Sequence, residues 1–185
     1  GGLLIREWEG EDVWQILFWR AFFFSITLGL FLYFTYKNEA LFIIKKSGIP
    51  GVVGGIAMAI GFTAYVFAMS ETTVANVLFI ISTQTIWLAL FGYFFLKEKI
   101  SLKTFLSIIL AMIGISVMIG GSLSTGSMQG NLVALFIPIN FAFLVLLIRK
   151  YSNLDLIPAL FYGGLIITIV AFFMSETILI SRHNL

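Results

Sequence analysis

The stretch VWQILFWRAFFFSITLGLFLYFTY, residues 13–36, contains a single charged side chain, Arg20, and decides the class of this chain. A bilayer span needs roughly 20 mostly apolar residues to cross a hydrocarbon layer about 30 Å thick. Five further runs of similar length and polarity follow it. We therefore predict an all-α, polytopic membrane protein built as a helical bundle. The six predicted spans are 13–36, 48–69, 74–96, 102–121, 129–148 and 157–175.

The overall composition supports this class and excludes several kinds of site. Apolar residues make up 60% of the chain, charged residues 11%, and the mean hydropathy is +1.06. A water-soluble domain of this size could not bury so much apolar surface. The chain has no cysteine, so thiolate metal sites and thiol nucleophiles are excluded. Its single histidine, His183, lies in a terminal segment, and we expect no metal site, no catalytic site and no cofactor.

Loops that alternate along the chain differ in their positive charge. Every second loop is rich in Lys and Arg, and these loops together hold eight such residues. The loops between them hold two Lys or Arg residues in total. Because cytoplasmic loops carry an excess of Lys and Arg, the basic loops are expected to face the cytoplasm. The basic loops are 37–47, 97–103 and 149–156, and the others are 1–12, 70–73, 122–128 and 176–185.

Both ends of the sequence look like parts of further spans. Residues 1–5 are apolar but too few to cross a bilayer, so we interpret them as the tail of an earlier helix. Residues 181–185 resemble a loop that enters another helix. The sequence is therefore expected to be an internal part of a longer protein.

An internal similarity links the first and last runs. Residues 12–31 align with residues 155–174 at a constant offset of 143 positions. The predicted topology puts five crossings between the two segments, and an odd number is what an inverted-topology repeat requires. Such repeats give a simple basis for alternating access. The identical pairs are Asp12/Asp155, Leu17/Leu160, Phe18/Phe161 and Ile26/Ile169.

Three short segments carry a family resemblance. They are ANVL at 75–78, LKEKIS at 96–101 ahead of a helix containing Gly114, and WQILFWR at 14–20. Their order and spacing resemble an EamA domain of the drug/metabolite transporter superfamily. On this resemblance, residues 1–121 are the first repeat, with the tail of helix 1 and helices 2 to 5. Residues 129–185 are then the start of a truncated second repeat, with helices 6 and 7.

The resemblance implies a ten-helix bundle of two inverted five-helix repeats that moves small metabolites, and a bacterial plasma membrane as its location. The chain departs from the family pattern at one position. Many members have a proline thirteen residues before the glutamate that matches Glu98, and this chain has Thr85 there, preceded by Gln84. A proline would kink the fourth helix near the substrate cavity, so the pocket geometry is not carried over.

Arg20 is the leading candidate for a substrate contact. It lies seven residues into its span, roughly 10 Å deep at 1.5 Å per residue. A guanidinium at that depth costs about 2.5–3.5 kcal/mol, so it should face a cavity or a partner. It could bind an anionic substrate group through paired N–H donors. Equally, its side chain could extend to the outer membrane interface beside Trp14 and Trp19, which would then be aromatic residues of the interfacial belt.

A polar stripe on the third predicted span gives a second group of candidates. Asn76, Thr83 and Trp87 fall within about 20° of one line on a helix, with Gln84 beside them. Polar groups of a lipid-embedded helix belong against protein or water, so the stripe is expected to face the bundle interior. It could bind substrate, with Trp87 packing on it. Interhelical hydrogen bonds worth about 0.6 kcal/mol each are the alternative.

Pro138 and Asn140 interrupt the next-to-last run near its middle. Unwound or kinked helices line transporter sites, which makes Asn140 a further substrate-binding candidate. A plain kink whose freed carbonyl is satisfied by neighbouring helices is the other interpretation.

Together these patterns predict a secondary transporter or exporter of small metabolites that is not an enzyme. Its expected partners are a small-molecule metabolite and the lipid bilayer, not nucleic acid, and the sequence leaves a homodimer open. The alternatives are an integral-membrane enzyme and a non-transporting scaffold or receptor. No Asp lies within a predicted span and the chain has one histidine, so an intramembrane catalytic group would have to come from outside this sequence.

Overall fold

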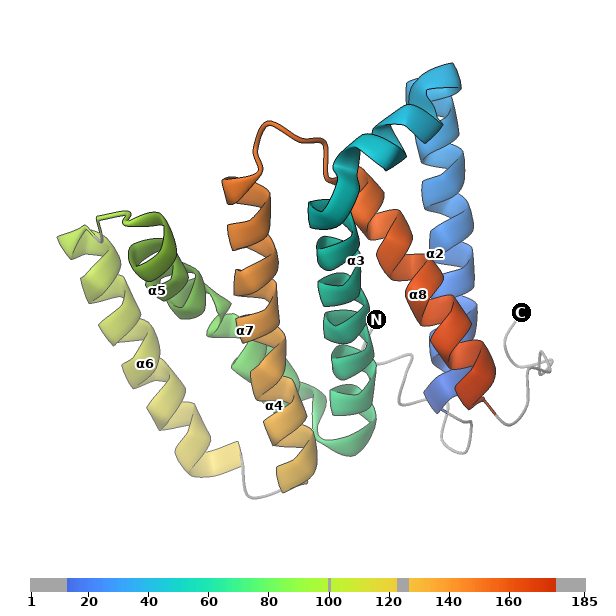
Figure 1. Cartoon of the computed structure of the whole chain (residues 1–185). Helices are drawn as coiled ribbons and strands as arrows, with labels where there is room; N and C mark the ends of the chain where they lie inside the picture. Colours follow the sequence, from blue (N-terminus) through green and yellow to red (C-terminus); the bar gives the residue numbers. More distant parts are fainter. Residues whose placement is uncertain (1–12, 100, 123–126, 176–185) are drawn as a thin grey trace.

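The computed structural model of the chain describes residues 13–99, 101–122 and 127–175. Helices joined by short turns and loops make up these ranges, which contain no strand. The interpretations of residues 1–5, Asp12 and His183 lie outside them. In chain order the elements are α2 (Val13–Tyr36), the 3-10 helix η1 (Lys37–Glu39), α3 (Ala40–Glu71), α4 (Val74–Ser82), α5 (Gln84–Leu96), α6 (Leu102–Ser122), α7 (Met128–Lys150) and α8 (Ile157–Met174) (Figure 1).

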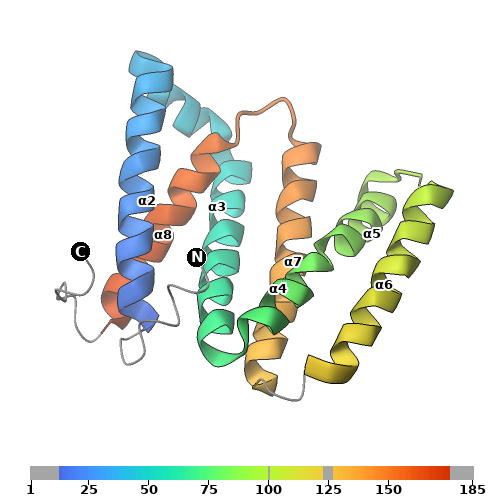
Figure 2. The ribbon, with the colours of Figure 1, turned by 180° about the vertical axis from the view of Figure 1, so that it is seen from behind.

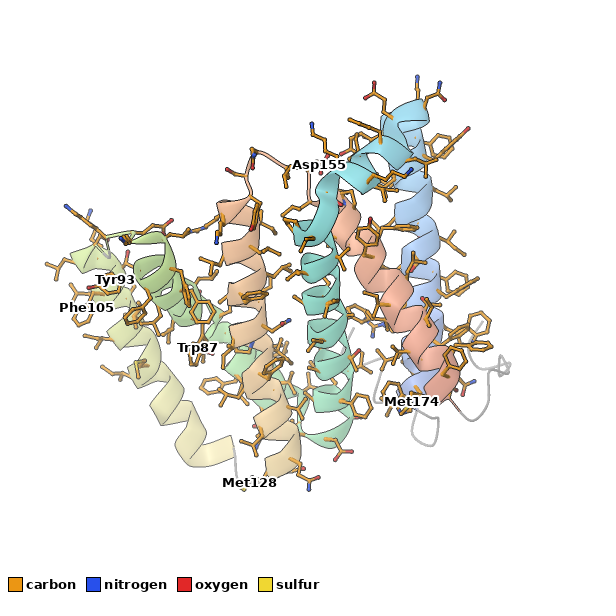
Figure 3. The ribbon with its side chains drawn as sticks, in the orientation of Figure 1. Trp87, Tyr93, Phe105, Met128, Asp155 and Met174 are labelled. Carbon is orange, nitrogen blue, oxygen red and sulfur yellow. The ribbon has the colours of Figure 1, made fainter. Side chains whose placement is uncertain are left out.

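The helices stand side by side in the order α2, α8, α3, α7, α4–α5, α6, as both views show (Figures 1 and 2). The connections α2–α3, α5–α6 and α7–α8 share one end of the bundle. We call it the basic end, because the three basic loops of the sequence lie there. Asp155 marks this end, and Met128 and Met174 mark the opposite end (Figure 3).

The close helix pairs are not the consecutive ones. α3 lies between α7 and α8, and α2 packs mainly on α8. The α3–α8 contact depends on glycines, which have no side chain. A Cβ on Gly55 would lie 3.1 Å from both the Ala159 carbonyl oxygen and the Gly163 backbone nitrogen. A Cβ on Gly163 would lie 2.8 Å from the Cβ of Met58. Small residues therefore let the two backbones approach, as is usual between helices in lipid.

A helical segment precedes the second predicted span. We predicted it to begin at residue 48, but α3 begins at Ala40 and bends at Gly48, whose φ of 52° and ψ of −146° are not helical. Glycine adopts this conformation without the steric penalty of a Cβ. The basic segment before the bend, with Lys45 and Lys46, is thus helical and is not the loop we expected.

The third predicted span is divided into two helices. α4 ends at Ser82, and Thr83 is both the C-cap of α4 and the N-cap of α5. The Thr83 amide donates to the Ile80 carbonyl at 3.1 Å, which is the tighter bonding of a 3-10 turn. The prediction that Asn76, Thr83 and Trp87 share one straight helical line is therefore wrong, because the interruption separates Asn76 from the other two. The interruption needs no proline.

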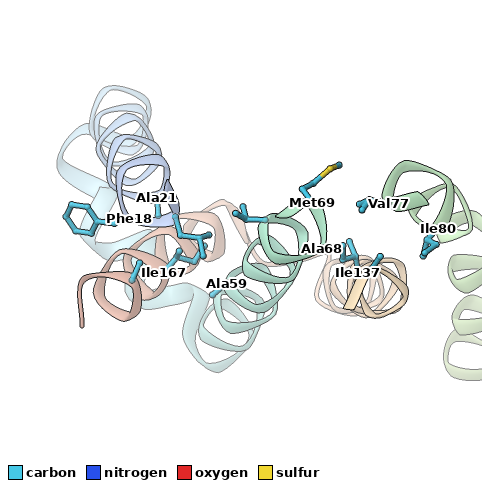
Figure 4. Packing of buried hydrophobic residues seen from close by; sticks show 13 residues of the cluster. Phe18, Ala21, Ala59, Ala68, Met69, Val77, Ile80, Ile137 and Ile167 are labelled. Carbon is cyan, nitrogen blue, oxygen red and sulfur yellow. The ribbon is translucent and has the colours of Figure 1, made fainter. Parts of the chain in front are cut away.

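A buried apolar cluster joins five helices (Figure 4). Leu17 of α2, Val66 of α3 and Val77 of α4 are fully buried in it. Small side chains, among them Ala59, Ala134 and Ala171, fill much of the remainder. Many of the large apolar side chains lie outside this cluster.

The outward surface is strongly apolar. Phe34, Leu41 and Phe173 expose 71%, 73% and 79% of their area. A water-soluble monomer does not carry such large apolar patches, whereas a protein in a bilayer does. Four helical segments of the described chain are long and apolar enough to cross a membrane, namely Val13–Glu71, Val74–Leu96, Met128–Lys150 and Ile157–Met174. The first contains both α2 and α3, while α6, on the predicted span 102–121, is not among the four. The chain is an integral membrane protein, and the count of six spans stays a prediction.

Candidate functional site

Three hollows lie between the helices. The first, of about 480 Å³, is lined by α3, α7 and α8 near the basic end and includes Gly54, Met58 and Leu144. The second, of about 580 Å³, lies between α5 and α7. The third, of about 440 Å³, lies between α3, α7 and α8 and includes Thr63. Of the six candidates from the sequence, only Asn140 lines any of these hollows, and it lines the second.

Arg20 packs on an aromatic ring. Its guanidinium carbon lies 5.3 Å from the ring centroid of Phe62 on α3, a cation–π distance. Phe24, one turn after Arg20, stacks on the same ring with centroids 6.4 Å apart. The side chain is partly exposed. In the described chain the only ion pair joins two other residues, so no carboxylate there neutralises Arg20. Such a guanidinium can receive an anion, and it can also serve packing alone.

Asn76 belongs to a buried polar cluster at the end of the bundle opposite the basic end. Its Nδ2 lies 3.3 Å from both Thr72 Oγ1 and Asn131 Oδ1. Thr72 Oγ1 in turn donates to Asn131 Oδ1 at 2.8 Å. Asn76 is only 1% exposed, and its Oδ1 has no hydrogen-bond partner among the described residues. These bonds join the α3–α4 corner to α7, which is the interhelical role that we gave as the alternative to substrate binding.

The other candidates on the divided span point to different partners. Thr83 Oγ1 donates to the Ile80 carbonyl oxygen at 2.7 Å, so this hydroxyl is hydrogen-bonded within its own turn. Trp87 lies between the two ends of the bundle, and its ring meets Phe91 edge-on with centroids 6.5 Å apart (Figure 3). Gln84 is the first residue of α5 and is partly exposed. The structure thus does not gather Asn76, Thr83, Gln84 and Trp87 into one site.

Asn140 ties α7 to α3. Its Nδ2 donates to the Ala57 carbonyl oxygen at 2.8 Å. A Cβ on Gly61 would lie 2.5 Å from that nitrogen, so glycine is what lets the amide reach α3. α7 continues through Pro138, which is buried, without a break in the helix. Neighbours therefore accommodate the proline, and no unwound segment forms there. Arg20 and Asn140 both meet α3 between Ala57 and Phe62, at a similar depth.

Two polar contacts at the basic end were not predicted. Arg149, in the last turn of α7, contacts both oxygens of Glu98 at 3.1 and 3.0 Å. Tyr36, the last residue of α2, donates to Asp155 Oδ2, and Asp155 Oδ1 accepts from the Ile157 amide at 2.9 Å. Each contact joins residues 51 or 119 positions apart, so no local pattern indicates it. The sequence signal was limited to the charges themselves, which stand at helix ends.

The chemistry available to this part of the chain is binding. Among the described residues no three His, Cys, Asp or Glu side chains lie close enough to hold a metal ion. In the described part of the chain, the polar groups between helices away from the basic end include the amides of Asn76 and Asn140 and the guanidinium of Arg20. They suit hydrogen bonding to a small solute and charge pairing with an anion.

Comparison with known proteins places the chain in one family. No curated protein and no solved structure matches it. Residues 4–120 match the EamA-like transporter family. The match covers α2 to α5 and most of α6, which is more than half of the 185 residues. The all-helical bundle, its apolar surface and this match agree, and the chain belongs to the EamA-like transporter family.

Proposed function

We propose that this protein is a secondary transporter that moves small metabolites across a bacterial plasma membrane by alternating access. The proposed architecture is ten helices in two inverted repeats, with residues 1–121 in the first repeat and residues 129–185 at the start of the second. Family membership carries the proposal, because members of this family are membrane transporters of the drug/metabolite type.

The arrangement of α2 and α8 supports the inverted repeat. These are the two helices that align at the offset of 143 positions in the sequence. They pack against each other and run in opposite directions (Figure 1). Opposite directions are what inversion about an axis in the membrane plane produces. Two such halves can open a central site to one side at a time.

Arg20 is the proposed contact for an anionic or zwitterionic substrate. Its guanidinium is partly exposed, and in the described chain no carboxylate pairs with it. A planar, permanently charged group with several N–H donors suits a carboxylate or a phosphate. The neutral side chains Asn76, Thr83, Gln84, Trp87 and Asn140 stay proposed as secondary contacts; Asn140 meets α3 at the depth of Arg20.

Metabolite profiling of cells tests the transport role. Medium and cytosol are compared for cells that express the full-length parent, Arg20→Ala, or the control Lys103→Ala on the exposed start of α6. We expect one class of anionic or zwitterionic solutes to shift across the membrane with the parent and the control, and not with Arg20→Ala. Membrane-fraction levels and melting temperatures show whether each variant is folded.

Each other outcome is informative. Transport retained in a folded Arg20→Ala variant contradicts the binding role of Arg20. Solutes that change chemically without moving favour the membrane-enzyme alternative. Unchanged profiles for the parent contradict transport of metabolites.

The proposed orientation puts the basic end in the cytoplasm. The charge distribution supports it, since positive loops stay inside. Because the chain has no native cysteine, a single cysteine reports one position cleanly. Ser101→Cys, exposed at the basic end, should resist a membrane-impermeant thiol reagent in intact cells, whereas Ser70→Cys, exposed at the opposite end, should react. The reverse pattern overturns the orientation.

A further inference from the structure

The hollow between α5 and α7 is a groove that follows a single face of α7. The α7 residues along it are spaced by three or four positions, which is one stripe of a helix. Phe91 and Phe95, one turn apart on α5, form the other wall. The α7 residues are Phe136, Ile139, Asn140, Phe143, Leu146, Leu147 and Lys150, and Tyr151 follows at the end of the helix.

The groove is open to its surroundings and apolar along its length. Phe95, Phe136 and Phe143 expose 66%, 45% and 40% of their area. Asn140 is the one polar residue below the groove's basic end, and its amide nitrogen is already bonded to the Ala57 carbonyl. An occupant of this groove therefore meets hydrocarbon and aromatic surface over most of its length. In an integral membrane protein such a surface is reached from the bilayer.

A free cation stands at the end of the groove. Lys150 is exposed, and in the described chain no carboxylate lies within ion-pair distance of it. Its nearest described aromatic partner is the adjacent Tyr151, with the ammonium 5.9 Å from the ring centroid. The neighbouring Arg149, by contrast, is paired with Glu98 at 3.0 Å. Among the residues that line the groove, Lys150 is thus the charged side chain that can meet an external anion.

The length of the groove matches one bilayer leaflet. From Phe136 to Lys150 the helix rises about 21 Å at 1.5 Å per residue. Half of a bilayer, headgroups included, is about 20–22 Å thick. A lipid whose headgroup lies at Lys150 would therefore extend its acyl chains to the level of Phe136, near the bilayer midplane.

We propose that the groove between α5 and α7 binds one anionic phospholipid, with the phosphate at Lys150 and an acyl chain along Phe91, Phe143 and Phe136. Basic pockets between membrane helices bind anionic headgroups in this way. Tyr151, the C-cap of α7, lies at the same end of the groove, and amphipathic aromatic rings are favoured where a headgroup would lie. The proposal rests on the membrane location of the chain and does not depend on the transport role.

Lipid retention by the purified full-length protein tests this site. The protein is exchanged into nanodiscs of phosphatidylglycerol or of phosphatidylcholine with the same acyl chains, and lipids that stay bound after mild delipidation are counted by native mass spectrometry. We expect one phosphatidylglycerol to be retained in preference to phosphatidylcholine. Lys150→Gln should weaken its retention about fivefold, the effect of one basic side chain near an anionic surface. The matched control Lys103→Gln removes the same charge at the same end but outside the groove and should leave retention unchanged.

A second variant tests the acyl-chain part of the groove. Ile139→Trp adds volume in the groove about 16 Å from Lys150 along the helix. It should lower retention without changing the charge. Equal retention of both lipids by the parent, or equal loss in Lys150→Gln and Lys103→Gln, overturns the proposal. A photoreactive residue replacing Phe143 should cross-link to lipid, and cross-links to protein alone show that another segment fills the groove and also overturn it.

Discussion

The α3–α8 and α5–α7 contacts differ in the size of the side chains between the two helices. Between α3 and α8, Gly55 and Gly163 bring the two backbones so close that no Cβ fits between them. Between α5 and α7, aromatic side chains such as Phe91 and Phe143 line a hollow of about 580 Å³. Both contacts join helices that run in the same direction across the bundle (Figures 1 and 2).

This difference indicates which contact stabilises the fold and which one is expected to bind a ligand. Lipid tails are as apolar as the side chains, so helices in a bilayer gain little from hiding apolar surface and associate mainly through close packing. The α3–α8 contact meets that condition. The α5–α7 contact meets it less fully, because a hollow runs along one side of it. We therefore expect mutations at the α3–α8 contact to lower the stability of the fold most. Mutations at the α5–α7 contact are expected to lower ligand occupancy most.

The largest effect is expected from one added methyl group at the tight contact. In Gly55→Ala the new Cβ would lie 2.6 Å from the Tyr162 Cβ and 3.1 Å from two backbone atoms of α8. None of these is the end of a flexible side chain, so the helices must separate. We expect the free energy of unfolding to fall by about 2–3 kcal/mol, measured by titrating mixed micelles with sodium dodecyl sulfate and following helicity.

The same substitution on α2 is the control. A Cβ on Gly29 would contact Phe161 Cε2 at 3.4 Å, an ordinary van der Waals distance. Alanine also favours helix over glycine by up to about 1 kcal/mol. Gly29→Ala should therefore be neutral or slightly stabilising. Equal losses at Gly55 and Gly29 would show that the α3–α8 contact is not the tight one.

Hydropathy predicts those helices whose ends coincide with a change in polarity. α2 has the predicted bounds, because Lys37 and Asn38 follow its apolar run directly. The α8 prediction is one residue too long at Ser175. The start of α3 and the interruption at Thr83 were missed for a physical reason. A helix can continue through polar residues such as Lys45, and the turn at Thr83 is stabilised by its own hydroxyl rather than by a proline.

Helix neighbours and site contacts were harder to predict than helices. Glycines such as Gly55 indicated close packing, but a small residue fits against many partners and does not identify α8. The same holds for the polar candidates. The sequence indicated that Asn76 and Asn140 need partners inside the bundle, yet the partners Asn131 and Ala57 are 55 and 83 positions away. Long-range pairing depends on the shapes of whole helices, and local composition does not contain it.

A smaller effect is expected at the polar bond behind the groove. Asn140→Ala removes the hydrogen bond to the Ala57 carbonyl, which in an α-helix also accepts from the Gly61 amide and so keeps a partner. Interhelical hydrogen bonds in membranes contribute about 0.6 kcal/mol on average. We expect Asn140→Ala to lower the free energy of unfolding by on the order of 1 kcal/mol, less than Gly55→Ala does.

Gly61 makes it possible to separate this bond from the packing of the asparagine. In the parent, Gly61→Ala would place a Cβ 2.5 Å from the Asn140 amide nitrogen and push it away from α3, offsetting the helix propensity that alanine adds. In the Asn140→Ala background there is no amide to displace. Gly61→Ala should therefore be about 1 kcal/mol more favourable in that background than in the parent, a coupling that a double-mutant cycle measures directly. If Gly61→Ala has the same effect in both backgrounds, the two residues are independent, and the α3–α7 contact is then held by apolar packing alone.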